Sequence, residues 1–357
     1  MQANMEMMKK ITGVPGVPGH EDKVRETIKE LMAGKAEIST DKLGSIICKK
    51  EGDPDGPKVM ISGHMDEIGF MVKTIDEKGF LFFTPLGGWW NQVMLAQRVK
   101  VMTKNGPVEG IIGSKPPHVL DPEEKKKPVE IKKMFIDVGT KTKEETEKLG
   151  IKPGDPVVPH SDFVQMANGD SLMTKAWDDR VGCALFMQVI EEFNRKKHPN
   201  VIYGVGSVQE EVGLRGAQTS SQLIEPDIGF ALEVGIAGDM PGMTEQQAQE
   251  KLGEGPVIFM LDRSLIPNTR LRDFVIETAR EKEIPYQVDF MEGGGTDAGK
   301  IHLVGGGVPS LVLAVPARYI HSHYSIISKK DYENTLKLLL EVITRLDKKT
   351  VEKFTSY

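Results

Sequence analysis

The sequence predicts an α/β protein with a mixed, mainly parallel sheet, helices on both faces of that sheet, and an inserted β-rich domain. From Asp178 onward, apolar runs of strand length alternate with amphipathic helical segments, an order typical of parallel sheets. Between about residues 71 and 166, short β-like runs and Gly/Pro-rich connections replace this alternation. We therefore expect one domain from residues 1–70 and 167–357, with residues 71–166 as the inserted domain.

The first 70 residues predict a helix followed by short strands. Val24, Ile28 and Leu31 recur at helical spacing over residues 20–33, and a glycine follows as a helix stop. Residues 58–64 form an apolar run that ends in Gly-His, which indicates a buried strand. These elements are expected to join the sheet formed by the second half of the chain.

The later segments divide into the insertion and the alternating half. Within the insertion, Asn105-Gly106 between two β-like runs indicates a hairpin. A final helix is expected from Ser328, whose Ser-Lys-Lys-Asp sequence is typical of a helix N-cap. Between these points the sequence predicts helices over residues 179–194, 214–223 and 269–283, and strands over 201–208, 228–234, 257–261, 287–290 and 310–315.

Composition excludes several classes of protein. The chain has 46 Lys+Arg against 52 Asp+Glu, a net charge of -6, so nucleic-acid binding is not expected. The longest mostly apolar stretch, residues 308–317, is far shorter than the ~18 residues of a membrane span. The opening residues lack the apolar run of a signal peptide, and two cysteines make no disulfide framework. We expect a cytoplasmic protein without a membrane partner.

Acids and histidines follow several of the predicted strands. In open α/β sheets, ligands bind beyond the carboxyl ends of the strands, so side chains at these positions are candidates for one site. A single histidine after a strand is more often a hydrogen-bonded core residue. Five separate groups of acids and histidines at such positions are harder to explain in that way. Histidines and carboxylates without cysteine suit Zn²⁺, Co²⁺ or Mn²⁺. The candidates are His64 and Asp66, Asp178-Asp179, Glu210-Glu211, Glu233, and His321.

The spacing of these residues suggests separate roles. His64 and Asp66 are two apart, so in an extended segment they share a face, and Asp66 can accept the second ring N–H of a metal-bound imidazole. Glu210 and Glu211 are adjacent and point in different directions, which suits one metal ligand and one proton carrier. One member of Asp178-Asp179 could bridge two metals, the usual centre of a two-metal hydrolase.

With these residues in view, the whole chain resembles the metallopeptidase family of glutamyl and leucyl aminopeptidases that form tetrahedral assemblies, some of whose members were named endoglucanases. The resemblance covers essentially the full length, and the order of the blocks makes it specific. The blocks are GHMDEIGF, GGWWNQVMLAQRVKV, KAWDDRVGCA, VQEEVGLRGA, EVGIAGDMPG, GGGTDAG and RYIHSH.

The resemblance implies a fold, a set of roles and two metal ions per subunit, zinc or cobalt with manganese as an alternative. The fold is a phosphorylase/hydrolase-like α/β domain with an inserted β-barrel-like domain. Glu210 is the implied general base and acid, and Asp66 the partner of His64. Asp178 bridges the metals, His64 and Glu233 complete one metal, and Glu211 and His321 complete the other.

The implied activity is metal-dependent removal of the N-terminal residue from short peptides, with glutamyl/aspartyl or broad specificity. A carboxylate-binding pocket would need a cation, for which Lys300, Arg263 and Arg270 are candidates. The implied assembly is a homo-oligomer, a dodecamer built from dimers, with residues 71–166 supplying much of the contact. A β domain of ~95 residues buries limited apolar area alone, which favours a partner surface.

Three positions depart from the pattern of many relatives. Glu233 stands where aspartate is frequent, Asp179 where asparagine is frequent, and His323 where proline is frequent. Glutamate is longer than aspartate, so Glu233 is expected to alter the metal preference or the pocket for the substrate amine. His321 is preferred to His323 as the ligand because it matches the RYIH block.

Three other functions remain as alternatives. A glycoside hydrolase of the endoglucanase type would need two carboxyls facing one sugar, whereas Glu210 and Glu211 diverge and two histidines would have no role. A phosphate-binding loop at Gly293–Gly295 lacks the Lys-Ser/Thr ending of such loops. A non-catalytic assembly protein would use Trp89-Trp90 and the insertion as surfaces.

Overall fold

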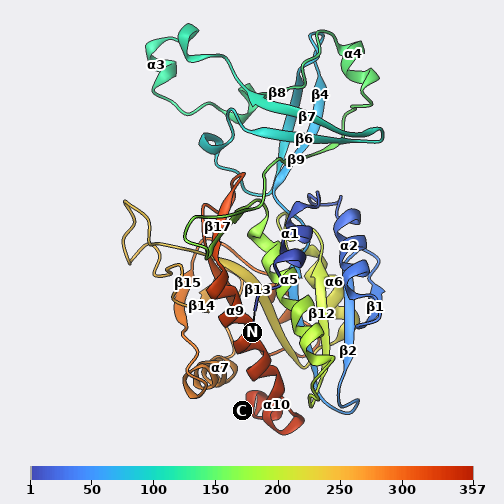
Figure 1. Ribbon diagram of the computed structural model, residues 1–357, viewed down its shortest axis with the longest axis vertical. Helices are drawn as coiled ribbons and strands as arrows, with labels where there is room; N and C mark the ends of the chain where they lie inside the picture. The colour runs from blue at the N-terminus through green and yellow to red at the C-terminus, as the bar shows by residue number, and fades with distance from the viewer. Residues whose placement is uncertain (1, 357) are drawn as a thin grey trace.

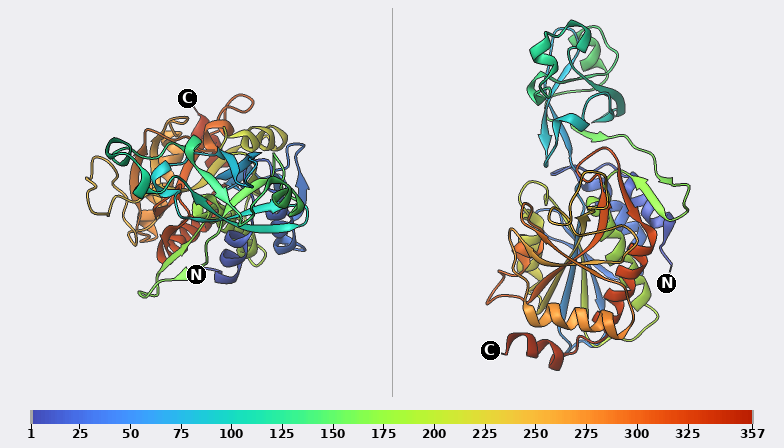
Figure 2. Two further views of the ribbon diagram at one scale, coloured as in Figure 1. Left: turned by 90° about the horizontal axis from the view of Figure 1, so that it is seen from above. Right: turned by 90° about the vertical axis from the view of Figure 1, so that its left-hand side faces the viewer.

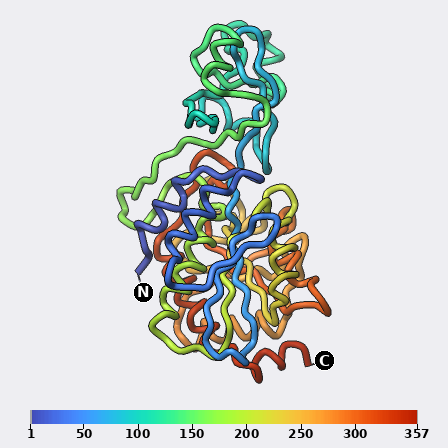
Figure 3. Tube along the Cα trace, turned by 90° about the vertical axis from the view of Figure 1, so that its right-hand side faces the viewer, coloured from blue at the N-terminus to red at the C-terminus, as the bar shows by residue number. Residues whose placement is uncertain are grey.

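The computed structural model describes residues 2–356 and arranges them as a sheet domain with a closed six-stranded barrel at one end (Figure 1). The predicted mixed α/β sheet with an inserted β-barrel is confirmed. Most of the barrel projects beyond the sheet domain, and the chain enters and leaves the barrel at the end nearest that domain (Figures 2 and 3). No helix within residues 2–356 is long and apolar enough to cross a membrane.

Within the described residues, the large sheet has eleven strands, and its centre is parallel. Strands β12, β3, β13 and β16 pair in parallel in that order, and antiparallel strands flank them. The parallel centre brings the carboxyl ends of these strands to one edge, which faces the barrel in Figure 1. The strands are β1 (Glu37–Thr40), β2 (Ile46–Glu51), β3 (Lys58–His64), β10 (Val164–Gln165), β11 (Ser171–Thr174), β12 (Val201–Ser207), β13 (Ile228–Ile236), β14 (Val257–Asp262), β15 (Gln287–Met291), β16 (Ser310–Arg318) and β17 (Ser325–Ser328).

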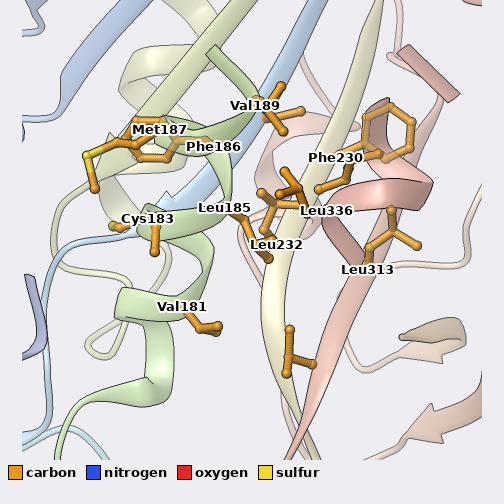
Figure 4. Close-up of a cluster of buried hydrophobic side chains, with 14 of the residues drawn as sticks. Val181, Cys183, Leu185, Phe186, Met187, Val189, Phe230, Leu232, Leu313 and Leu336 are labelled. Carbon is orange, nitrogen blue, oxygen red and sulfur yellow. The ribbon is translucent and has the colours of Figure 1, made fainter. Parts of the chain in front are cut away.

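Helices cover both faces of this sheet, as the continuous apolar strand runs require. Val59 and Ile61 of β3 lie in the core beneath α5, whereas Met60 packs on the opposite face with residues of α6 and α8. Figure 4 shows the first core, in which Leu185 of α5 shares a cluster with Leu232 and Leu336. The helices of the first face are α1 (Met5–Gly13), α2 (Asp22–Met32), α5 (Trp177–Phe193), α7 (Thr269–Glu281) and α9 (Lys329–Thr344). The terminal helix α10 (Lys348–Thr355) adds Val351 and Phe354 to the same core, whereas α6 (Arg215–Ile224) and α8 (Ala298–Ile301) cover the opposite face.

The barrel closes in the strand order β4-β5-β8-β7-β6-β9 around its own core, which includes Phe70, Val101 and Ile136. The hairpin predicted at Asn105-Gly106 joins β6 to β7, where Thr103 pairs with Gly106. The barrel strands are β4 (Gly69–Ile75), β5 (Leu81–Leu86), β6 (Arg98–Thr103), β7 (Gly106–Gly113), β8 (Phe135–Asp137) and β9 (Pro156–Pro159). Short helices join them: η1 (Asn91–Val93), η2 (Pro117–Val119), α3 (Pro122–Lys125), η3 (Ile131–Lys133) and α4 (Lys143–Lys148).

The ends of the elements refine the expected organisation. The barrel strands run from Gly69 to Pro159, and Val164–Gln165 pair with β11 of the large sheet, so we propose a domain boundary a few residues before the expected position 166. The helix expected at 20–33 is α2, and Ser328 caps α9 by accepting the N–H of Asp331 at 3.3 Å.

Helix α1 has no counterpart among the predicted elements. Its apolar face is short: Met7, Met8 and Ile11 are buried against the main core. Asn4 caps it by accepting the N–H of Met7 at 3.1 Å. Asn4, a residue type that often caps helices, stands directly before this short apolar pattern and could have indicated the start of the helix.

Candidate metal centre

The predicted site residues meet at the edge of the sheet that faces the barrel. His64 ends β3, Glu233 lies in β13, and Asp178 lies in the first turn of α5. Glu210 and Glu211 follow β12, and His321 follows β16. These six side chains line one cavity of about 980 Å³, and Asp66 lies behind them, fully buried.

Asp178 lies at the centre of the cluster. Its Oδ1 is 3.0 Å from Nε2 of His64, and its Oδ2 is 3.2 Å from Nε2 of His321. Nε2 of His321 is also 3.6 Å from Oε1 of Glu211, and Nε2 of His64 is 3.8 Å from Oε2 of Glu210. One carboxylate thus faces two imidazoles, one with each oxygen, and each imidazole has a further glutamate beside it.

The far side of each imidazole is held by a backbone carbonyl. Nδ1 of His64 lies 3.0 Å from the carbonyl oxygen of Asp66, and Nδ1 of His321 lies 2.7 Å from that of Gly88. A carbonyl only accepts, so both Nδ1 atoms carry a proton, and in the neutral form of each ring the lone pair is on Nε2. That tautomer presents Nε2 to a metal ion.

Asp66 contacts His64 with both its backbone and its side chain. Its carbonyl is the nearest acceptor for His64, and its carboxylate Oδ1 is 3.6 Å from the ring Nδ1. The two carboxylate oxygens also accept the backbone N–H groups of Glu210 and Glu211, each at 3.1 Å. Asp66 therefore fixes the turn from which these two glutamates diverge toward different histidines.

A loop of the barrel reaches into the site, a contribution that sequence reasoning missed. Gly88 follows β5 and supplies the carbonyl that holds His321. A Cβ at Gly87, whose φ is +81°, would lie 2.9 Å from Oε2 of Glu211, and one at Gly88 would lie 3.1 Å from Nδ1 of His321. Glycines at both positions let the backbone of this loop approach Glu211 and His321 closely. The Gly-Gly pair before Trp89-Trp90 is the sequence feature that could have indicated this approach.

Asp179, the neighbour of Asp178, is committed to the backbone. Its Oδ2 accepts the N–H of His64 at 2.9 Å and its Oδ1 accepts that of Gly182 at 3.0 Å. Two groups of donor atoms converge within 4.8 Å: His64, Asp178 and Glu211, and also His64, Asp179 and Glu233. The hydrogen bonds of Asp179 favour Asp178 as the residue whose oxygens remain available to an ion.

Crowding of buried acids governs the electrostatics of the site. Burial and then the Asp178 charge raise the pKa of Glu211 to about 8, and burial raises the pKa of Glu210 and Glu233 well above the usual range. Burial opposes the change at His321, but its hydrogen bond to Asp178 and the charge of Glu211 raise its pKa to about 9. The two imidazoles are outnumbered by the buried carboxylates around them, so the site favours additional positive charge.

The donor set fits divalent cations. Oε1 of Glu211 is buried without a hydrogen-bond partner among the described residues, and four carboxylates (Asp178, Glu210, Glu211 and Glu233) share the cavity with two imidazoles. Carboxylates packed this closely can all remain ionised when bound cations neutralise their charge. Histidine nitrogen and carboxylate oxygen are the ligands of zinc and of neighbouring first-row metals.

His323 lies outside the cluster. Its ring packs against Trp89 with centroids 5.2 Å apart, and neither ring nitrogen has a hydrogen-bond partner within residues 2–356. Burial lowers the pKa of His323 to about 4, so the ring is neutral near pH 7. His321, and not His323, faces the carboxylates.

Comparison with known proteins gives a consistent result over the whole length. Residues 44–338 match the M42 glutamyl aminopeptidase family. The chain is 35% identical to lysyl aminopeptidase of Pyrococcus furiosus (strain ATCC 43587 / DSM 3638 / JCM 8422 / Vc1), over 96% of this chain and 98% of the relative.

Two solved structures have the same fold. A TET aminopeptidase of the marine sediment archaeon Thaumarchaeota archaeon SCGC AB-539-E09 superposes with a TM-score of 0.97 at 49% identity, covering 98% of each chain. The TET1 peptidase of Pyrococcus horikoshii, which can assemble into a tetrahedron or a large octahedral shell, gives a TM-score of 0.87 at 31% identity, covering 96% of this chain and 99% of its own.

Proposed function

The chain belongs to the M42 family of glutamyl aminopeptidases and is a peptide hydrolase, and we propose that it removes N-terminal residues from short peptides with two divalent metal ions. Asp178 carries the two-metal proposal, because its oxygens face two different histidines at 3.0 and 3.2 Å. We assign His64, Asp178 and Glu233 to one ion and Asp178, Glu211 and His321 to the other.

The ions would be zinc or cobalt, with manganese as an alternative, because the donors are imidazoles and carboxylates without cysteine. When bound, they supply Lewis-acid activation of a water molecule and of the scissile carbonyl. The protein's own contribution is to hold the two Nε2 atoms toward Asp178 through the carbonyls of Asp66 and Gly88.

Glu210 is the proposed general base and acid. Its side chain lies beside His64, while the adjacent Glu211 turns toward His321, so the two glutamates serve different parts of the site. Burial and nearby carboxylates raise the pKa of Glu210, which helps it to keep a proton once it has taken one. Glu210 takes the proton of the attacking water and gives it to the leaving amine.

Glu233 would receive the free α-amine of the substrate. It is a buried carboxylate on the cavity wall, beyond His64. Acetylating the amine removes its charge, and loss of a charged hydrogen bond costs about 1.5–3 kcal/mol. We therefore expect N-acetyl-leucyl peptides to be cleaved at least about 10-fold more slowly than the free peptides.

The assay should compare matched free and acetylated peptides by chromatography, with Glu210→Gln as the control for contaminating peptidases. Equal cleavage of both peptides would contradict the exopeptidase assignment. Carboxymethyl cellulose tests the glycoside hydrolase alternative, and cellulose hydrolysis that disappears in Glu210→Gln would replace the proposal. The divergence of Glu210 and Glu211 toward different histidines favours the peptidase.

We also propose that the chain forms a dodecameric homo-oligomer, in which the barrel supplies contact surface. Trp90, 60% exposed on the barrel loop that carries Gly88, and Val119, 61% exposed, are apolar groups available for a partner. A shell around the active sites would admit short peptides and exclude folded proteins. Light scattering should give a mass near twelve chains, and a monomer with and without metal would contradict the assembly.

A further inference from the structure

The cavity extends beyond the metal centre along the end of β13, and this extension has an acidic wall. Outside the six residues of the centre, the ionisable side chains that line the cavity are Asp289 and Glu292. No lysine or arginine within residues 2–356 lines it, and the candidate cations Lys300, Arg263 and Arg270 are therefore absent from the wall. The ionisable groups that a substrate side chain would meet here are all carboxyl groups.

A buried glutamate stands next to this wall. Glu250 is 1% exposed, and its carboxylate lies over Gly235 of β13, where a Cβ would come within 1.9 Å of Oε2. Residues 233 and 235 share a face of the strand, about 6.6 Å apart. The Glu250 carboxylate thus occupies the same face as Glu233, one pleat further from the metal centre.

Asp289 connects Glu250 to the cavity. Its side chain lines the cavity and accepts the backbone N–H groups of Gln249 at 3.2 Å and Phe290 at 2.8 Å. Burial and then the charge of Asp289 raise the pKa of Glu250 well above its usual range, and Oε2 of Glu250 has no hydrogen-bond partner within the described residues. Asp289 in the wall and Glu250 directly behind it therefore form a pair of neighbouring acids.

We infer that this wall selects a basic N-terminal residue, with Asp289 contacting its side-chain cation and Glu250 acting as a positioning residue behind Asp289. The inference rests on the proposed aminopeptidase function. If the α-amine of the substrate lies at Glu233, the side chain of the same residue runs along β13 toward Gly235 and Asp289. Lysine carries its ammonium on a flexible four-carbon stem, which suits this span. An acidic side chain would meet only like charge there.

The first test compares the wild-type enzyme on lysyl, norleucyl and glutamyl p-nitroanilides. Norleucine keeps the apolar stem of lysine and lacks the ammonium, so the ratio of the two kcat/KM values reports the cation alone. A charged hydrogen bond to a buried acid predicts a lysine-to-norleucine ratio of about 10 to 100. We expect the glutamyl substrate to be slower than both.

The second test locates the preference in the wall. Asp289→Asn should lower the lysine-to-norleucine ratio by about 10-fold or more, and Glu250→Gln should lower it in the same direction. Glu292→Gln is the matched control, because Glu292 lines the same cavity but is exposed, and it should change the ratio by less than about 5-fold. Because the readout is a ratio within one preparation, partial loss of folded enzyme does not change it.

The outcomes separate the inference from the proposed function. A wild-type ratio near 1, or a faster glutamyl substrate, would overturn the inference and leave the aminopeptidase standing. A high wild-type ratio that neither Asp289→Asn nor Glu250→Gln lowers would overturn the assignment to these residues. Failure to cleave any of the three substrates, with metal supplied and leucyl peptides also intact, would instead contradict the proposed function.

Discussion

Replacing Glu210 by glutamine is expected to lower kcat by about 10²- to 10⁴-fold while leaving the metal content unchanged. Glutamine keeps the size of the side chain and the backbone N–H that Asp66 accepts at 3.1 Å, but it can no longer carry a proton. Initial rates on a leucyl p-nitroanilide and metal analysis of the same preparation provide the measurement. The loss should fall on kcat, because the proton transfer occurs in the transition state.

Glu211→Gln is the matched control for Glu210→Gln, since the two residues are adjacent and both N–H groups bind Asp66. Glu211 lies beside His321 and is assigned to a metal, so its replacement should lower metal content as well as rate. If Glu210→Gln lost metal and Glu211→Gln kept it, the roles of the two glutamates would have to be exchanged.

Asp178→Asn is expected to abolish tight binding of two ions and to lower kcat/KM by about 10³-fold or more. An amide offers one oxygen and two N–H groups, so it cannot present an acceptor to both histidine sides of the site. Activation by metal ions contributes several kcal/mol, and about 4 kcal/mol corresponds to ~10³-fold in rate. Rate and metal stoichiometry are measured on dialysed protein after reconstitution with zinc or cobalt.

Asp179→Asn makes the same chemical change one residue later. Asp179 accepts the backbone N–H groups of His64 and Gly182, and an amide oxygen can still serve one of them. We expect this variant to keep both ions and to lose less than about 10-fold in kcat/KM, in line with the cost of about one hydrogen bond. Loss of the ions in Asp179→Asn, with retention in Asp178→Asn, would move the bridging role to Asp179.

The gathering of the site residues could be predicted because it depends on strand order. His64 and Glu233 end or follow apolar runs in parallel strands, and such ends meet at one edge of a sheet. Helix α1 was missed because its buried face is only Met7, Met8 and Ile11, too short for a clear period.

Other parts of the site depend on contacts between distant segments. The Gly88 carbonyl that holds His321 comes from the barrel, 233 residues away in sequence, and a backbone acceptor leaves no side-chain signal. The hydrogen bonds that the Asp66 carboxylate accepts from the backbone of Glu210 and Glu211 could not be predicted either, since they require the folded turn after β12. Glu250 and Asp289 could not be singled out from the sequence, because the space that Gly235 leaves for the Glu250 carboxylate is evident only in the folded structure.

Metal stoichiometry tests the two-metal centre most directly. Apoprotein titrated with zinc or cobalt, with bound metal measured by mass spectrometry and activity followed in parallel, should bind two ions per chain and reach full activity only as the second site fills. Occupancy that stops at one ion per chain with full activity would contradict a centre bridged by Asp178.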